Sequence, residues 1–198
     1  MKELSDFIKS KVTIETADLN RILGAFSQMS LDKHDLILKT GQISKYYYFI
    51  KTGAMRFYYG EYEEQLTAWV ILKNEFFAEI SSLNPQIASR FNIEAIEKTE
   101  LYCIHKDEME RLYQQIPAWQ EFGRRIWENM SIRMIDRIIS FQTKSAEQRY
   151  LEFMQDVELI KRIPVKHIAS FLGITPNALS RATNERKRKR GDISSADF

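Results

Sequence analysis

Near the C-terminus of this 198-residue sequence, four polar side chains recur at helical spacing. They are Asn177, Ser180, Arg181 and Asn184. The apolar residues of the same segment, Leu179 and Ala182, fall on the other side of a helix that starts at Pro176. Thr175, directly before that proline, suits an N-cap. Arginine can donate two hydrogen bonds to O6 and N7 of guanine, and asparagine can pair with N6 and N7 of adenine. The segment is therefore predicted to be a helix that contacts base edges in DNA.

A short helix before this one is predicted to hold it in place. Ile168 and Leu172 lie one turn apart, and the small Ala169 between them permits a close helix crossing. Gly173 then supplies a turn. Residues 165–182 thus have the layout of a helix-turn-helix.

Positive charge is concentrated at the same end of the sequence. The whole chain carries a net charge of +2, whereas residues 161–198 carry +6 and residues 1–160 carry −4. Residues 186–190 are all basic. Such runs neutralise backbone phosphates, which position a protein on DNA without reading its sequence. Lys187 in this run and the N-cap Thr175 complete the predicted DNA-binding set.

A long helix is predicted upstream, because residues 118–141 contain no proline and one glycine over about six turns. Its apolar residues form two stripes. The first contains Phe122, Ile126, Met130, Met134, Ile138 and Phe141, and the second contains Trp127, Ile132, Ile135 and Ile139. Packing on one domain requires a single stripe, so the helix is predicted to pair with a second copy of the chain. The predicted dimer contacts are Phe122, Ile126, Met130, Met134 and Ile138. A central helix buried on all sides of a monomer is the alternative.

The residues before the long helix change periodicity. Residues 16–29 have the spacing of an amphipathic helix, whereas residues 36–104 alternate with a period of two and are rich in β-branched and aromatic residues. The predicted strands are residues 36–38, 46–50, 54–59, 66–72 and 93–104. Turn signals that contain Gly41, Gly53 or Gly60 separate several of them. Many short strands at close spacing predict a barrel, roll or sandwich.

Several classes of site are disfavoured by composition. The lone Cys103 lies in an apolar run, which excludes an intrachain disulfide and predicts a small buried side chain. His34, His105 and His167 lack a carboxylate at ligand spacing, so no metal site is predicted. No nucleophile–base pair or glycine-rich phosphate loop is found, and we predict neither catalytic residues nor an enzyme. The sequence contains no apolar run of membrane-spanning length, and a cytoplasmic protein without membrane contact is expected.

With these residues established, the sequence resembles the Crp/Fnr superfamily of bacterial transcription regulators. Residues 48–53 are similar to the aromatic turn of its β-roll, and residues 77–80 to its phosphate-binding cassette. The resemblance implies an α+β fold: an N-terminal double-stranded, jelly-roll-like sensor domain (1–112), a dimerisation helix (113–143) and a helix-turn-helix domain (144–198). A wing that is reduced or absent is expected, because few residues follow Arg190.

The resemblance also implies an effector site in the β-roll. The candidate residues are Phe77, Ala78, Glu79, Ile80, Ser89 and Arg90. Ala78 stands where nucleotide-binding members have glycine. The strand alignment places Ser89 where they have the phosphate-binding arginine, and the bulky Phe91 where they have a small residue. Strand alternation then directs Arg90 to the opposite face, while a loop one residue different in length would return it to the pocket. Cyclic AMP, another small effector and no ligand all stay open, with cyclic AMP disfavoured and no cofactor assigned.

Together these features predict a homodimeric transcription regulator that binds a palindromic operator in double-stranded DNA. RNA polymerase is an expected partner if the protein activates transcription. The alternative is a cyclic-nucleotide sensor or adaptor module that does not bind DNA.

Overall fold

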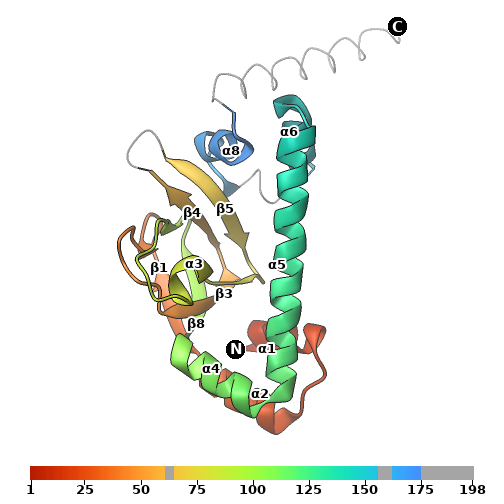
Figure 1. Ribbon diagram of the computed structural model, residues 1–198. Helices are drawn as coiled ribbons and strands as arrows, with labels where there is room; N and C mark the ends of the chain where they lie inside the picture. Colours follow the sequence, from red (N-terminus) through yellow and green to blue (C-terminus); the bar gives the residue numbers. More distant parts are fainter. Residues whose placement is uncertain (61–64, 156–161, 175–198) are drawn as a thin grey trace, which may run out of the picture.

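The computed structural model describes residues 1–60, 65–155 and 162–174 (Figure 1). Its helices are α1 (Lys2–Lys11), α2 (Thr16–Gly24), α3 (Ile80–Leu83), α4 (Lys106–Gln115), α5 (Pro117–Thr143), α6 (Ala146–Phe153) and α8 (Val165–Leu172). Its strands are β1 (Ser27–Leu31), β2 (Leu36–Leu38), β3 (Tyr46–Thr52), β4 (Ala54–Tyr59), β5 (Leu66–Leu72), β6 (Phe76–Phe77), β7 (Asn92–Ala95) and β8 (Thr99–His105).

The strands form two four-stranded antiparallel sheets that enclose an apolar core. One sheet has the order β1-β8-β3-β6 and the other has the order β2-β7-β4-β5. Apolar side chains from both sheets, among them Ile50, Met55, Ile71 and Ile93, meet between them. Period-two strands that bury one face on a shared interior produce this arrangement. The predicted β-roll is confirmed.

The turn between β3 and β4 requires a glycine. Gly53 has a φ of +92°, and a Cβ there would lie 2.4 Å from Oγ1 of Thr99 and 2.7 Å from the carbonyl oxygen of Lys98. This close approach lets the hydroxyl of Thr99 accept a hydrogen bond from the backbone N–H of Ala54, at 3.2 Å. The turn predicted from Gly53 is confirmed.

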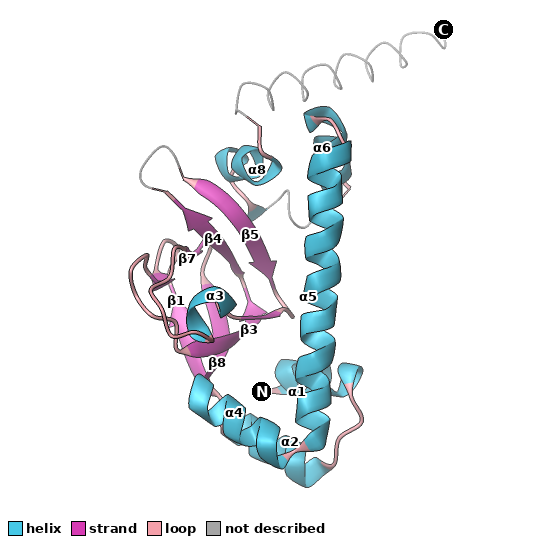
Figure 2. Ribbon diagram, viewed as in Figure 1, coloured by secondary structure: helices cyan, strands magenta, loops and turns pink. Residues whose placement is uncertain are grey.

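Helices cover the outside of the first sheet. Figure 2 shows α1, α2 and α4 gathered at one end of the strands, and α5 running along their side. Their apolar faces form a second core with β3 and β6, in which Trp119 and Phe122 of α5 stack at 4.4 Å between ring centroids. Burial of these rings fixes the first half of α5 against the roll.

Most predicted elements agree with the structure, and the long helix extends from Pro117 to Thr143. The predicted helix over residues 16–29 is too long, because α2 ends at Gly24 and β1 begins at Ser27. The predicted strand over residues 93–104 is two strands, β7 and β8, with residues 96–98 between them.

Candidate functional site

The cassette predicted from the sequence, residues 77–80, begins in β6 at the edge of the first sheet. Phe77 pairs with Tyr48 of β3, and their rings stack at 5.2 Å. The next residues, Ala78 and Glu79, lead into α3. Glu79 caps this helix, since its Oε1 accepts hydrogen bonds from the backbone N–H of Ser81 at 3.2 Å and from the Ser81 hydroxyl at 2.5 Å. The side chain of Glu79 is buried, and its Oε2 has no hydrogen-bond partner among the described residues.

A cavity of about 400 Å³ lies between this cassette, the second sheet and α5. Aromatic side chains supply much of its wall: Phe57, Trp69, Phe77, Phe91 and Trp127. The charged residues that line it are Glu79, Arg90 and Arg137. Volume, apolar walls and a few polar groups are the features of a small-molecule site. The structure thus brings five of the six predicted effector residues to one cavity, namely Phe77, Ala78, Glu79, Ile80 and Arg90.

Ser89 does not line the cavity, and the expected register of this segment is wrong. Its hydroxyl donates to the carbonyl oxygen of Phe91 at 3.1 Å and accepts from the N–H of Phe91 at 3.0 Å. Its backbone N–H donates to the carbonyl oxygen of Gln42 at 2.8 Å. Because β7 begins only at Asn92, the alternation of that strand does not extend back to Ser89. Arg90 therefore lines the cavity instead of facing away from it.

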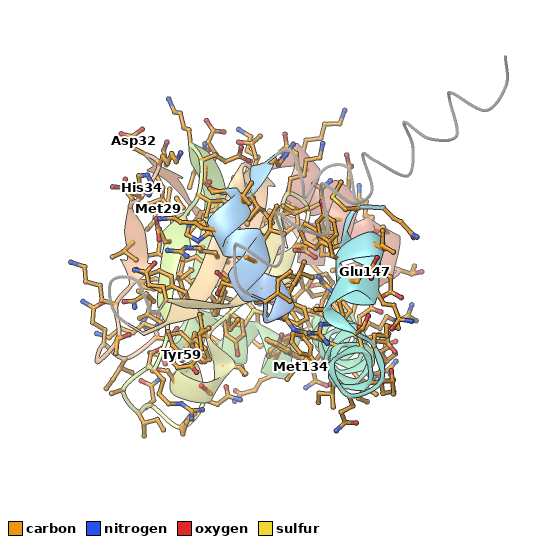
Figure 3. All side chains as sticks on the ribbon, turned by 90° about the horizontal axis from the view of Figure 1, so that it is seen from above. Met29, Asp32, His34, Tyr59, Met134 and Glu147 are labelled. Carbon is orange, nitrogen blue, oxygen red and sulfur yellow. The ribbon has the colours of Figure 1, made fainter. Side chains whose placement is uncertain are left out.

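The side of α5 that faces the roll supplies Trp127, Met130, Met134 and Ile138 to the cavity. Figure 3, a view along α5, shows Met134 on this side of the helix. The assignment of Phe122 and Ile126 as dimer contacts is wrong, because both are buried in the core of their own chain.

The second apolar stripe of α5 is exposed as well. Ile132, Ile135 and Ile139 have relative exposures of 57%, 55% and 50%, whereas Phe122 has 0%. Met134 and Ile138 of the predicted dimer stripe are 52% and 55% exposed, so in the second half of α5 both stripes are accessible to a second copy of the chain.

Arg137 connects the cavity with two other elements. Its guanidinium lies 5.3 Å from the ring centroid of Trp69 in β5 and 3.9 Å from that of Phe171 in α8. Its Nη2 donates to the carbonyl oxygen of Phe171 at 3.0 Å. Burial lowers the pKa of Arg137 to about 10. The side chain remains a cation at neutral pH, although it is largely withdrawn from water.

Comparisons with known proteins assign the first half of the chain. The sequence model of the cyclic nucleotide-binding domain matches residues 28–116, which contain the roll and the cassette. Residues 28–116 thus have the sequence features of a cyclic nucleotide-binding domain. A search of curated protein sequences gave no match.

Solved structures extend the comparison to the whole fold. FixK2 from Bradyrhizobium japonicum is 20% identical, with a TM-score of 0.67 over 83% of this chain and 85% of its own. A CooA variant from Carboxydothermus hydrogenoformans is 17% identical, with a TM-score of 0.68 over 90% and 87%. A protein from Eubacterium rectale assigned to the Crp/Fnr family of transcriptional regulators is 14% identical, with a TM-score of 0.66 over 89% and 85%. The Crp/Fnr resemblance is thus confirmed at the level of the fold.

Beyond the cyclic nucleotide-binding domain, α8 is the first helix of the predicted helix-turn-helix. Ile168, Ala169 and Leu172 are buried, as their spacing predicts. Gly173 ends the helix with a φ of +66°, and a Cβ there would lie 2.8 Å from Phe141. Both the backbone conformation and the space favour glycine at this turn.

The predicted DNA-binding residues Thr175, Asn177, Ser180, Arg181, Asn184 and Lys187 lie outside the described residues. The question of a wing falls in the same region. Their roles therefore stay predictions from the sequence.

The α8 helix docks on the cyclic nucleotide-binding domain. The backbone N–H of Thr67 donates to the hydroxyl of Ser170 at 2.7 Å, and this hydroxyl donates to the carbonyl oxygen of Gln65 at 3.1 Å. Val70 of β5 and Ile168 of α8 belong to one apolar cluster. In this conformation the two parts of the chain share a core.

A buried ionic network joins α8 to β4 and β7. It was not predicted from the sequence. Arg56 of β4 is 2% exposed and donates to Oε2 of Glu94 from Nη2 at 2.8 Å and from Nε at 3.1 Å. Its Nη1 donates to Nδ1 of His167 in α8 at 2.7 Å. Nδ1 of His34 lies 2.7 Å from Oε1 of Glu94. Burial acts to raise the pKa of Glu94, but the hydrogen bonds from His34 and Arg56 outweigh it and hold that pKa below its usual value.

His167 makes this contact sensitive to pH. Burial, and then the positive charge of Arg56, lower its pKa to about 4, so the ring is neutral at pH 7 and Nδ1 accepts from Arg56. The unfolded chain binds this proton near pH 6.5 and the folded chain only near pH 4. We therefore expect the free energy of unfolding to fall by about 3 kcal/mol between pH 6.5 and pH 4.

Urea unfolding at half-unit pH steps measures this loss, with His167→Gln as the comparison. The loss attributed to His167 should be absent from this variant. Lys166 and His34 also act on the ring, and the pKa of the neighbouring Glu94 is held below its usual value. Equal pH slopes for the variant and the wild type between pH 6.5 and pH 4.5 would contradict the assignment.

Among the described residues, no group of three His, Cys, Asp or Glu side chains could hold a metal ion. Cys103 is buried, as predicted. No helix in residues 1–60, 65–155 and 162–174 combines the length and apolar character needed to cross a bilayer.

Proposed function

We propose that this protein is a homodimeric transcription regulator of the Crp/Fnr type that binds double-stranded DNA and responds to a small effector. The observation that carries the proposal is the pair formed by α8 and its left-handed Gly173 turn, followed in sequence by Thr175-Pro176. A helix, a glycine turn and a capped second helix form a helix-turn-helix. In this proposal residues 1–112 sense the effector, 113–143 dimerise and 144–198 bind DNA. It acts in the cytoplasm and meets RNA polymerase if it activates transcription.

The second helix is proposed to enter the major groove. Starting at Pro176, it directs Asn177, Ser180, Arg181 and Asn184 away from the apolar side formed by Leu179 and Ala182. The basic run that contains Lys187 follows and contacts phosphates. A dimer requires a two-fold-related operator whose half-sites lie about one helical turn, roughly 34 Å, apart.

Two sets of substitutions separate base contacts from phosphate contacts. Arg181→Ala should cost about 1 to 3 kcal/mol on the preferred operator and relax base choice at one position of each half-site. Neutralising Lys187 and Lys189 should weaken binding to all sequences alike and lower the salt slope by about one per lost phosphate contact. The measurement is affinity for operator and random duplexes over a salt series.

The preferred duplex is first selected from randomised DNA. If Arg181→Ala weakens operator and random duplexes equally, while the lysine changes alter sequence preference, the residues are assigned to the wrong roles. If selection enriches no duplex, the alternative of a sensor or adaptor that does not bind DNA is favoured.

A further inference from the structure

Two hydrogen-bond donors in the wall of the cavity are buried and lack a partner. Nε1 of Trp69 and Nη1 of Arg137 have no acceptor among the described residues. Both side chains line the cavity between the cyclic nucleotide-binding domain and α5. Buried donors without acceptors are uncommon because each costs its desolvation. Both donors belong to residues that line this cavity and lie next to each other, so one acceptor that reaches them from the cavity would satisfy both.

The charges around the cavity indicate where that acceptor lies. On the cassette side, the cavity is lined by one carboxylate, Glu79, and one guanidinium, Arg90, whose formal charges sum to zero. On the α5 side, Arg137 lines the cavity without an ion pair within the described chain, and burial is the cause of its lowered pKa. The neighbouring Arg133 is already bound to Glu75 at 2.6 Å. The α5 side is therefore the positive side of the cavity.

The aromatic side chains that line the cavity indicate the chemistry of the rest of the ligand. Five aromatic side chains surround a volume of about 400 Å³, and Phe91 contacts Phe57 edge to face at 6.3 Å. This number of aromatic side chains around one cavity favours a flat, apolar ligand that stacks on them or meets them edge to face.

We propose that the cavity binds an aromatic organic anion, with its rings among these aromatic side chains and its acidic group on Arg137 and Trp69. The inference rests on the proposed function in one respect, that this cavity is the effector site. It differs from a cyclic nucleotide held through its phosphate at the cassette, because the anion lies on α5 and β5. Nη2 of Arg137 also binds the carbonyl oxygen of Phe171, so a ligand there acts on the same side chain that holds α8.

Two fluorescent probes that differ by one acidic group test the proposal. 1-Anilinonaphthalene-8-sulfonate carries a sulfonate, and N-phenyl-1-naphthylamine is the same ring system without it. Arg137→Met should weaken the sulfonate probe by about 10-fold to 100-fold and change the neutral probe less than about 2-fold. Trp69→Phe keeps a ring and removes the N–H, so it should weaken the sulfonate probe by about 3-fold to 10-fold.

Matched variants locate the binding. Arg124→Met, nearer the start of α5, should leave both probes unchanged, because Arg124 does not line this cavity and pairs with Glu121 and Glu128 at the surface. Ala68→Trp should fill the cavity and exclude both probes. Thermal melting shows which variants are folded. If Arg137→Met does not fold, Trp69→Phe still tests the proposal.

Several results would overturn the proposal. They are equal weakening of both probes in Arg137→Met, no effect of Trp69→Phe, retention of either probe in Ala68→Trp, and loss of the sulfonate probe in Arg90→Met alone. Sub-micromolar binding of cyclic AMP in calorimetry that disappears in Arg90→Met would place the anion at the cassette and also overturn it. DNA selection on the same preparation is independent: if it fails while the probe results hold, the proposed function fails and the ligand class stands.

Discussion

Ile135→Glu is expected to convert the protein from a dimer to a monomer and to raise the dimer dissociation constant at least about 100-fold. Ile132, Ile135 and Ile139 are spaced by three and four residues and are all at least half exposed. This spacing is that of a helix seam that pairs with another helix. In a two-fold dimer, one substitution places two carboxylates at the interface, where each loses hydration without gaining a partner. Sedimentation velocity over a micromolar concentration series measures the change.

The matched control introduces the same charge elsewhere on the helix. Asn129 is exposed and lies roughly 120° around α5 from Ile135, so Asn129→Glu should remain a dimer. Met134→Glu tests the stripe first predicted from the sequence, because Met134 belongs to that stripe. Met134 also lines the cavity. Dissociation by Met134→Glu with a dimeric Ile135→Glu would return the interface to that stripe, and a monomeric wild type would remove the dimer altogether.

The sequence predicted the roll because its strands alternate, and it missed elements that do not. In β1 only Leu31 is buried, so Ser27–Leu31 offers no apolar alternation to detect. The strand β6 has two residues, which is too short for any period. The long helix was predicted because residues 118–141 contain no proline and one glycine, but the spacing of its apolar residues alone does not tell which of them meet the roll. That choice depends on contacts distant in sequence, such as Phe76 against Phe122 at 5.6 Å between ring centroids.

The candidate site was also predicted only in part. Cassette residues were found through the resemblance to the Crp/Fnr superfamily, because the two-residue β6 offers no period to detect. The placement of Ser89 and Arg90 failed because a hydrogen-bonded turn, with the Ser89 hydroxyl on the backbone of Phe91, interrupts the alternation. Arg137 gave no signal, since an arginine on an amphipathic helix is ordinary until its aromatic neighbours are known.

The burial of Arg56 could not be predicted from the sequence, for a different reason. Every residue of β4 up to Tyr58 is buried, because the roll core covers one face and α8 covers the other near Arg56. A strand covered on both faces loses its period of two, and a polar residue within it is not distinguished. The network around Arg56 joins the sensor to α8, and so does Arg137 on the cavity side. The docking of α8 thus depends on two cations, one of which lines the cavity.

Arg56→Met is expected to lower the free energy of unfolding by about 3 to 5 kcal/mol, because it removes one partner of a buried ion pair. Glu94 is 7% exposed and would lose both hydrogen bonds from the guanidinium while keeping that of His34. Arg56→Met with Glu94→Gln should be more stable than Arg56→Met alone, because no buried carboxylate is then left without its cation. Urea unfolding of the wild type, the two single variants and the double variant completes the cycle. Hydrogen exchange of α8 should rise in Arg56→Met, since Nδ1 of His167 loses its donor. A destabilisation below about 1 kcal/mol, or a double variant less stable than the single one, would show that Glu94 and His167 do not depend on Arg56.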